Sequence, residues 1–158
     1  MTEPVVAETY VLFELAGTAY AVPSNMVQQV QMVEQITPVP NAVPVVEGVV
    51  YTRGRVIPAL NLRVRFGFEK IPFDMRSRLI VVNVAGRTVG LLADTAREFV
   101  RIPASSIEPP PEGISGLSGK YLQGIASVKG RLVLVLRLGE VIDIGDMDAI
   151  VAEPQQTD

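Results

Sequence analysis

Short runs of apolar residues, most of them bounded by glycine or proline, recur along almost the whole chain. The runs are rich in valine, isoleucine, leucine and aromatic residues, a composition typical of β-strands. Many are apolar at successive positions instead of alternating, which predicts strands that are covered on both faces. The predicted strands are residues 9–16, 18–22, 49–52, 56–62, 78–85, 87–93, 97–102, 122–128 and 131–136. The sequence therefore predicts a mainly β protein.

Four dipeptides that end in glycine separate pairs of these runs: Ala16-Gly17, Arg53-Gly54, Ala85-Gly86 and Lys129-Gly130. A tight hairpin turn needs positive φ, which glycine adopts without strain, so each dipeptide predicts a hairpin. Helix is expected in only two segments. One is residues 24–30, where Val27 and Val30 could share a face of a helical turn, and the other is residues 138–152.

Two parts of the sequence occur twice. Residues 48–62 read GVVYTRGRVIPALNL, and residues 124–138 read GIASVKGRLVLVLRL. A second similarity links residues 13–30, FELAGTAYAVPSNMVQQV, with residues 82–99, VNVAGRTVGLLADTAREF. Internal repeats indicate a repeated structural unit, here a small β-barrel that is too small to bury a good core alone. Two such barrels packed together are expected, with a binding groove between them.

Composition excludes several kinds of chemistry. The 158 residues include no cysteine and no histidine, while 48% of them are hydrophobic. A disulfide framework, a thiolate metal site, phosphohistidine chemistry and the usual general base are therefore unavailable. The sequence also lacks a phosphate-binding loop and a carboxylate cluster of metal-binding spacing, so we expect no catalytic residue, no cofactor and no metal. No apolar run reaches the roughly 20 residues that span a bilayer, which predicts a soluble protein.

Charge is distributed unevenly along the chain. No lysine or arginine precedes Arg53, seven of them follow between residues 53 and 78, and residues 140–158 carry acids without one base. These blocks are either solvated faces or a polarised surface that steers a protein partner. Nucleic-acid binding is disfavoured by a pI near 5.0 and by the absence of aromatic residues among the arginines.

The run GVVYTRGRVIPALNLR resembles the CheW family, the adaptor proteins of bacterial chemotaxis arrays. It is preceded by a YAVP segment and followed by VVNVAGRTVGLLAD and by the terminal GIASVKGRLVLVLRL. The resemblance extends from about Tyr10 to Ile144. Its most specific element is the hairpin of Arg53 and Gly54, with Pro58 in the outgoing strand.

This resemblance implies a fold of two five-stranded Src-homology-3-like barrels with short helices, one of them C-terminal. The barrels would be interleaved in one domain over residues 9–153, between flexible tails at 1–8 and 154–158. The implied function is that of a non-catalytic cytoplasmic coupler, recruited to membrane-associated receptor arrays. Its partners would be the regulatory domain of a CheA-type histidine kinase, the cytoplasmic tip of chemoreceptors and other CheW-like proteins.

The resemblance also implies that the receptor is bound in the groove between the barrels, at Val27, Gln29, Gly48, Arg53 and Gly54. The chemistry of each residue also allows a structural role. Arg53 could be a solvated turn residue and Val27 a core residue. Gly48 and Gly54 would allow close approach of the backbone. The sequence departs from the family at three positions. Gln29 stands where a glutamate is usual, and Asn61 and Arg137 stand where an aspartate is usual, so ion pairs built on those acids are missing or relocated.

Two alternatives remain open. Residues 91–96, LLADTA, resemble the active-site loop of retroviral-type aspartic proteases, in which a homodimer would bring two copies of Asp94 together to share a proton. Against this, Asp94 matches Asn25 in the repeat, as expected of a turn or cap, and Thr95 with Glu98 forms a possible capping pair. The chain could also be the regulatory domain of a chemotaxis histidine kinase.

Overall fold

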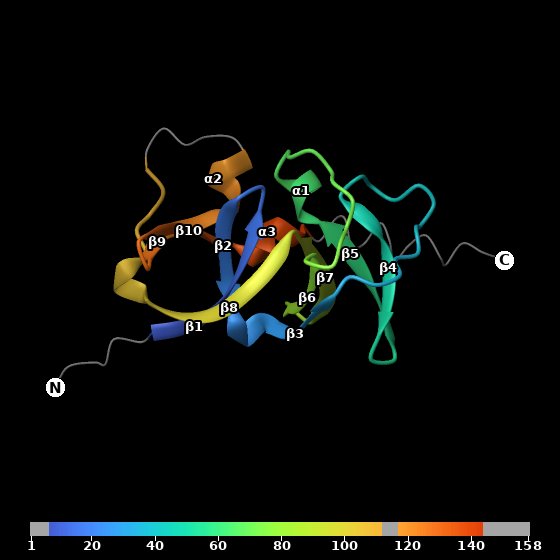
Figure 1. Ribbon diagram of the computed structural model, residues 1–158, viewed down its shortest axis with the longest axis horizontal. Helices are drawn as coiled ribbons and strands as arrows, with labels where there is room; N and C mark the ends of the chain where they lie inside the picture. The colour runs from blue at the N-terminus through green and yellow to red at the C-terminus, as the bar shows by residue number, and fades with distance from the viewer. Residues whose placement is uncertain (1–6, 112–116, 144–158) are drawn as a thin grey trace.

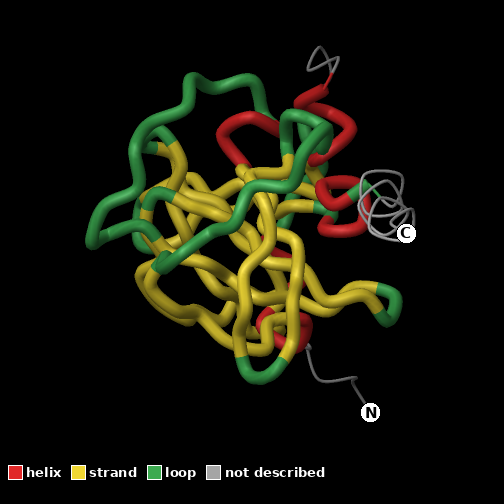
Figure 2. Tube along the Cα trace, turned by 90° about the vertical axis from the view of Figure 1, so that its right-hand side faces the viewer, coloured by secondary structure: helices red, strands yellow, loops and turns green. Residues whose placement is uncertain are grey.

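The structure is a computed structural model that describes residues 7–111 and 117–143, and these form two β-sheets lying side by side (Figure 1). Strands make up most of the described chain, and the helices are short (Figure 2). The strands are β1 (Ala7–Leu15), β2 (Thr18–Pro23), β3 (Val27–Met32), β4 (Val46–Thr52), β5 (Arg55–Asn61), β6 (Arg78–Val84), β7 (Arg87–Ala93), β8 (Thr95–Pro103), β9 (Leu122–Val128) and β10 (Arg131–Leu136). The helices are α1 (Leu62–Arg65), α2 (Leu117–Tyr121) and α3 (Leu138–Ile142), with short 3-10 turns at Ser24–Met26 and Ala104–Ser106. None of these helices is long and apolar enough to cross a membrane.

Each sheet has five strands and closes into a small barrel. Barrel A has the order β8-β1-β2-β10-β9, and barrel B has the order β3-β6-β7-β5-β4. The segment after β8 pairs with β9 through Glu108 and Ile125, and the segment after β3 pairs with β4 through Thr37 and Val49. The edge strands are β8 and β9 in barrel A and β3 and β4 in barrel B. These contacts therefore bring the two edges of each sheet together. The predictions of a mainly β chain and of two five-stranded barrels are confirmed.

The two barrels repeat one topology but exchange a strand. The hairpin β1-β2 corresponds to β6-β7, and β9-β10 corresponds to β4-β5, as the sequence repeat predicts. The strand that follows the first hairpin, β3, pairs with β6 in barrel B, whereas β8, which follows β7, pairs with β1 in barrel A. Each barrel therefore contains one strand whose preceding hairpin belongs to the other barrel.

Three hydrophobic clusters explain why the strands are apolar on both faces. In β1, Tyr10 and Leu12 point into barrel A, while Val11 and Phe13 belong to a larger cluster between the barrels. Barrel B has its own interior, to which Leu79 of β6 contributes. Alternate residues of a strand point to opposite faces, so each of these strands serves a barrel interior and the inter-barrel core.

The four predicted hairpin turns are present. Arg53 and Gly54 have φ values of 51° and 78°, and the other three turns have the same pattern of positive φ at both central residues. This pattern belongs to the two-residue hairpin turn whose twist matches that of the flanking strands. The glycine at the second position of each turn accommodates this conformation without the steric cost that a side chain would add.

The prediction of a helix at residues 24–30 is wrong. Only Ser24–Met26 forms a 3-10 turn, and Val27 begins β3, where a bulge shifts the register between Val27 and Gln29. The predicted capping pair of Thr95 and Glu98 is also wrong, because both residues lie in β8.

The predicted C-terminal helix is present as α3 over Leu138–Ile142, and the rest of that prediction lies outside the described residues. At the other end, β1 begins at Ala7. Ala7 and Glu8, which were expected in the N-terminal tail, therefore pair with Pro103 and Ile102 of β8. The predicted tail at 154–158 also lies outside the described residues.

Candidate functional site

A shallow groove of about 140 Å³ lies between the two exchanged strands, β3 and β8. Its lining residues are Val11, Val30, Ala96, Glu98 and Phe99. Val30 of β3 and Phe99 of β8 occupy equivalent positions of the repeat, so the groove is built from matching residues of the two barrels. Phe99 is 63% exposed, which is unusual for a phenylalanine on the side of a strand that faces the inter-barrel core.

Val27 and Val30 both pack against the inter-barrel core. In a regular strand two residues three positions apart would point to opposite faces, but the bulge after Val27 restores a common face. Val27 is opposite Val82, and Val30 is opposite Ile80, both of which belong to that core. Val27 therefore packs against the core, as its chemistry allowed, and its contact with a receptor stays a prediction.

Gln29 points to the other face of β3 and joins the hairpin β4-β5. Its Nε2 donates to Oγ1 of Thr52 at 3.0 Å and to the side-chain oxygen of Gln31. Thr52 in turn donates from Oγ1 to Gln31 Oε1 at 3.1 Å. This small amide and hydroxyl network holds β3 beside the residue that precedes Arg53, so the structure brings Gln29 close to the hairpin tip.

Arg53 and Gly54 form the exposed tip of that hairpin. Within the part of the chain that the structure describes, the Arg53 guanidinium has no hydrogen bond or ion pair. Beside the tip, Tyr51 and Val56 face each other across the two strands and are 74% and 63% exposed. The tip thus combines cationic side chains, Arg53 and the exposed Arg55, with an apolar pair, which is the composition of a protein-binding surface more often than of a plain turn.

Gly48 lies apart from that tip, buried at the start of β4. A Cβ at this position would overlap the carbonyl oxygen of Thr37 and lie 2.8 Å from its carbonyl carbon. The equivalent Gly124 is covered in the same way by Ile107 and Glu108. Close backbone approach is therefore the role that the structure gives Gly48, and any contribution to partner binding would act through this packing.

The two positions where the family usually has aspartate behave differently. Asn61 is buried and caps α1, because its Oδ1 accepts from the backbone N–H groups of Arg63 at 2.9 Å and Val64 at 3.3 Å. Its Nδ2 also donates to Oε1 of Glu47 at 3.0 Å. Arg137 precedes α3 with no side-chain cap. Asn61 thus keeps the capping function of a carboxylate, whereas Arg137 does not.

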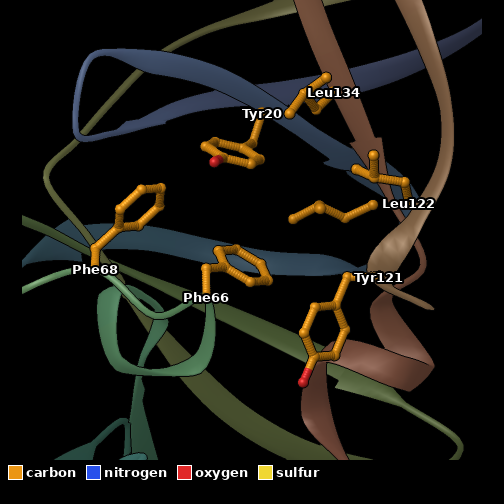
Figure 3. A pocket seen from close by; sticks show the side chains of 7 residues that line it. Tyr20, Phe66, Phe68, Tyr121, Leu122 and Leu134 are labelled. Carbon is orange, nitrogen blue, oxygen red and sulfur yellow. The ribbon is translucent and has the colours of Figure 1, made fainter. Parts of the chain in front are cut away.

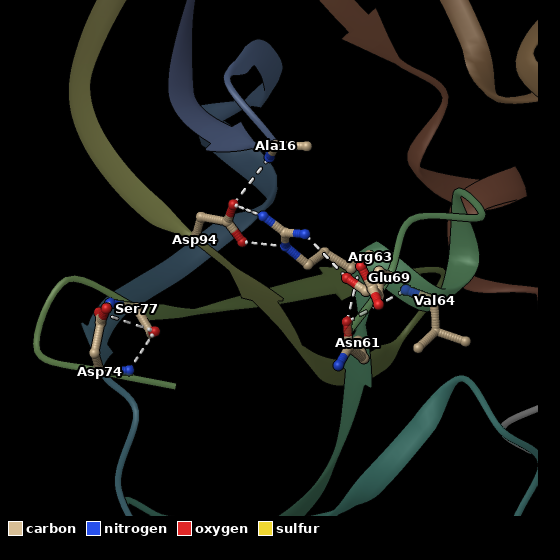
Figure 4. Close-up of polar contacts among 8 residues, drawn as sticks. All are labelled: Ala16, Asn61, Arg63, Val64, Glu69, Asp74, Ser77 and Asp94. Carbon is tan, nitrogen blue, oxygen red and sulfur yellow. Dashed lines mark hydrogen bonds and ion pairs between the residues drawn. The ribbon is translucent and has the colours of Figure 1, made fainter. Parts of the chain in front are cut away.

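Asp94 is held in an ion pair that links the two barrels (Figure 4). Arg63 of α1 donates from Nε to Oδ1 at 2.8 Å and from a terminal nitrogen to Oδ2 at 2.7 Å, and the backbone N–H of Ala16 donates to Oδ2 at 2.9 Å. Burial alone would raise the pKa of Asp94, but the hydrogen bonds from Arg63 and Ala16 outweigh it and lower the pKa below its usual 3.8. The hydrogen bond to Asp94 raises the pKa of Arg63. Asp94 therefore remains ionised, and both of its carboxylate oxygens already accept hydrogen bonds. A catalytic aspartate of this protease class would instead share a proton with a second aspartate.

Sequence reasoning missed an aromatic pocket of about 90 Å³ near α1 and α2 (Figure 3). It is lined by Tyr20, Phe66, Phe68, Tyr121, Leu122, Leu134 and Leu136. Tyr20 stacks on Phe66 with ring centroids 5.6 Å apart, and burial raises the pKa of Tyr20. The stack spans both barrels, so it serves first to join them.

Across residues 7–111 and 117–143, no cluster of acidic side chains is arranged to hold a metal ion.

Sequence reasoning also missed Phe99 as a groove residue. The signal was available in the repeat, because residues 96–99 match residues 27–30, and Val27 had already been singled out. The same match could have identified β3 as a strand, since its partner β8 was predicted as one.

Comparison with known proteins gives concordant matches over most of the chain. The sequence profile of the family described as CheW-like domain matches residues 9–145. Chemotaxis protein CheW of Thermotoga maritima is 31% identical over 131 residues, covering 83% of this chain and 85% of that protein. Chemotaxis protein CheW of Klebsiella aerogenes is 26% identical over 142 residues, covering 90% and 86%.

A solved structure agrees with these matches. The crystal structure of the scaffolding protein TtCheW from Thermoanaerobacter tengcongensis is similar with a TM-score of 0.81 and 29% identity, and the match covers 89% of this chain and 96% of that one. That protein has two Src-homology-3-like subdomains, which correspond to barrels A and B. The chain belongs to the CheW-like domain family.

Proposed function

We propose that this protein is a chemotaxis adaptor that couples chemoreceptors, the methyl-accepting chemotaxis proteins, to a CheA-type histidine kinase. The observation that carries the proposal is the groove between β3 and β8, which is lined by Val30 and by the exposed Phe99. An exposed apolar strip between two rigid barrels suits the apolar face of a helix. Membership of a family whose relatives are named chemotaxis protein CheW supports this assignment.

The receptor tip would contact both faces of β3. Val30 lines the groove and Val27 packs against the same inter-barrel core, whereas Gln29 reaches the hairpin that carries Arg53 and Gly54. A helical hairpin lying along this strand could therefore meet the apolar groove and the cationic tip together. Gly48 supports the arrangement indirectly, because it lets the segment at Thr37 pack onto β4.

The adaptor would act without catalysis, in the cytoplasm, at receptor arrays on the membrane. The kinase contact would be made by its regulatory domain, and further contacts could involve other CheW-like proteins. Residues 9–153 would serve as one domain of two interleaved barrels. The lack of histidine and cysteine in the sequence supports a binding role over an enzymatic one.

The two alternative functions are less well supported. A protease would need Asp94 to share a proton with its copy, and Arg63 already engages both carboxylate oxygens. No observation favours the regulatory domain of a kinase over the adaptor. The chemotaxis proteins CheW that resemble this chain align with it over most of their own length.

The test is reconstitution from purified components. The chain is titrated with a helical-hairpin fragment of a chemoreceptor tip from the same organism, with the regulatory domain of its CheA-type kinase, and with both together. We expect each to bind and a ternary complex to form. Failure to bind either component, or nucleotide hydrolysis that copurifies with the protein, would contradict the adaptor function.

A further inference from the structure

The two barrels differ in charge at equivalent positions on the hairpin tip and the exchanged strand. In barrel A, Lys129 at the tip of the hairpin β9-β10 lies 3.7 Å from the carboxylate of Glu98 on β8. In barrel B, the position of Lys129 is taken by Arg53 and that of Glu98 by Gln29. One barrel therefore supplies its own acid to the cation at the hairpin tip, and the other does not.

The equivalence of these positions is geometric as well as sequential. Glu98 follows the bulge of β8 and pairs with Leu12, and Gln29 follows the bulge of β3 and pairs with Val81. Leu12 points into barrel A and Val81 into barrel B, so both side chains reach the end of their own barrel. Gln29 confirms this placement, because it donates to Thr52, the neighbour of Arg53.

Barrel B provides no substitute for the missing acid among its described residues. Gln29 is neutral, and its amide donates hydrogen bonds to Gln31 and Thr52. Glu47, on the same hairpin, accepts from Asn61 and Lys70. Arg53 therefore has no acidic partner among the described residues, at a tip that also exposes Tyr51 and Val56.

We propose that the receptor tip supplies the missing carboxylate: an Asp or Glu side chain binds Arg53 above Gln29, in the place that Glu98 takes beside Lys129. The inference rests on the proposed adaptor function and adds the chemistry of the contact. Gln29 is then a specificity residue, because a neutral side chain there leaves the cation available to a partner. An acid at that position would satisfy Arg53 within the chain and repel the partner's carboxylate.

The chemistry of the site suits a carboxylate better than another acceptor. An arginine guanidinium binds a carboxylate through two parallel hydrogen bonds, and Gln29 beside it is neutral and does not repel the incoming charge. Apolar side chains at Tyr51 and Val56 would exclude water from the pair once a partner covers them, which strengthens a charge interaction. The expected partner segment therefore carries an acid next to apolar residues.

The test is the variant Gln29→Glu, titrated against the receptor-tip fragment at low salt. We expect affinity to fall about tenfold, because the new acid pairs with Arg53 and opposes the partner's acid. Gln28→Glu is the matched control, since it adds the same charge one residue away on the exposed bulge position of β3. It should change affinity by less than about threefold.

Two further measurements separate this contact from a general loss of structure. In an Arg53→Gln background, Gln29→Glu should have little additional effect, because both changes act on one interaction. Wild-type affinity should also fall with added salt more steeply than that of Gln29→Glu. Thermal melts should be alike, since a carboxylate at position 29 can still accept from Thr52, and Gln31 can turn its amide to donate.

The outcomes distinguish this inference from the adaptor function itself. If wild type does not bind the receptor tip, the proposed function fails. If wild type binds but Gln29→Glu binds equally well, or loses no more than Gln28→Glu, the carboxylate contact is overturned and the adaptor function stands. A loss confined to the kinase regulatory domain would also overturn it, because the acid would then belong to the kinase. Neutralising the receptor's acids one at a time should identify one whose loss matters to wild type and not to Gln29→Glu.

Discussion

Arg63 donates hydrogen bonds to both carboxylate oxygens of Asp94, from Nε to Oδ1 at 2.8 Å and from a terminal nitrogen to Oδ2 at 2.7 Å. Asp94 lies where the chain passes from barrel B to barrel A. Asp94 also accepts from the backbone of Ala16, in the β1-β2 turn of barrel A. One side chain of barrel B is thus bonded through Asp94 to a turn of the other barrel. The equivalent position in the first half of the chain is Asn25, which is exposed, so only one of the two strand crossings is held in this way among the described residues.

Replacing Asp94 should destabilise the protein. For Asp94→Asn we expect the free energy of unfolding to fall by about 2 kcal/mol, the usual size for a charge-assisted hydrogen bond that is mostly shielded from water. The partners are 15% and 23% exposed at Arg63 and Asp94, so solvent screens them only in part. Denaturant unfolding measures the loss, and Asn25→Ala at the equivalent crossing is the control, which should cost less than about 0.5 kcal/mol. Equal losses for the two variants would contradict the linking role of Asp94.

The same pair should make stability depend on pH. The folded-state pKa of Asp94 is lowered from 3.8, so its contribution is present above the pKa of the unfolded state and is lost as the pH falls through the folded-state pKa. The melting temperature of wild type should therefore fall more than that of Asp94→Asn as the pH drops below about 4. Melts from pH 7 to pH 2.5 test this, and parallel curves would show that Asp94 does not carry the dependence.

Reversing the charge of Arg53 should weaken receptor binding. For Arg53→Glu we expect a loss of at least about 1.4 kcal/mol, a factor of ten, with folding changed by no more than about 0.5 kcal/mol because the tip is exposed. Kinase binding should survive better. Lys129→Glu, at the equivalent tip, should cost the receptor contact less, although it breaks the ion pair with Glu98. Titration against both partners with thermal melts checks this, and an unfolded Arg53→Glu protein would return Arg53 to a structural role.

The exposed ring of Phe99 should matter for the same partner. For Phe99→Ser we expect receptor affinity to fall about tenfold, because the ring provides apolar area in the groove. Leu132→Ser is a matched control, since Leu132 is 66% exposed against 63% for Phe99 and lies on β10, outside the groove lining. Calorimetric titration measures both, and an equal loss for Leu132→Ser would move the receptor site away from the groove.

A methyl group at Gly48 should disrupt folding before binding. Gly48→Ala would push Cβ against the carbonyl of Thr37, at a cost of about 2 to 3 kcal/mol, as expected of overpacking against backbone. Gly54→Ala has nothing within 4 Å and should cost only about 1 kcal/mol, from its φ of 78°. Urea unfolding ranks the two variants. A stable Gly48→Ala protein that no longer binds the receptor would instead make Gly48 a direct contact.

The ends of the domain can be tested by truncation. Removing residues 1–6 and 154–158 should leave the melting temperature unchanged, because both segments fall outside the sequence repeat. Removing residues 1–8 should lower it slightly, since Ala7 and Glu8 pair with β8. A large loss from the shorter truncation would show that a terminus packs on a barrel.

Much of this architecture could be predicted from the sequence. The four hairpins follow from turn dipeptides whose conformation depends on local sterics, and Arg53-Gly54 adopts the expected positive φ values. The doubly apolar strands predicted buried surfaces on both sides, and the repeat predicted two similar barrels. Val27–Met32 escaped this reasoning because its bulge breaks the period of two and its glutamines mask the apolar pattern.

The sequence by itself determined the hairpins, the strand character and the doubling of the unit, because each depends on neighbouring residues. Tertiary structure decided the exchange of β3 and β8, and with it the groove that joins Val30 to Phe99 and the ion pair that joins Arg63 to Asp94. These features depend on which distant surfaces meet. Each half of the repeat carries nearly the same local pattern, and local pattern cannot specify which of two similar barrels a strand completes.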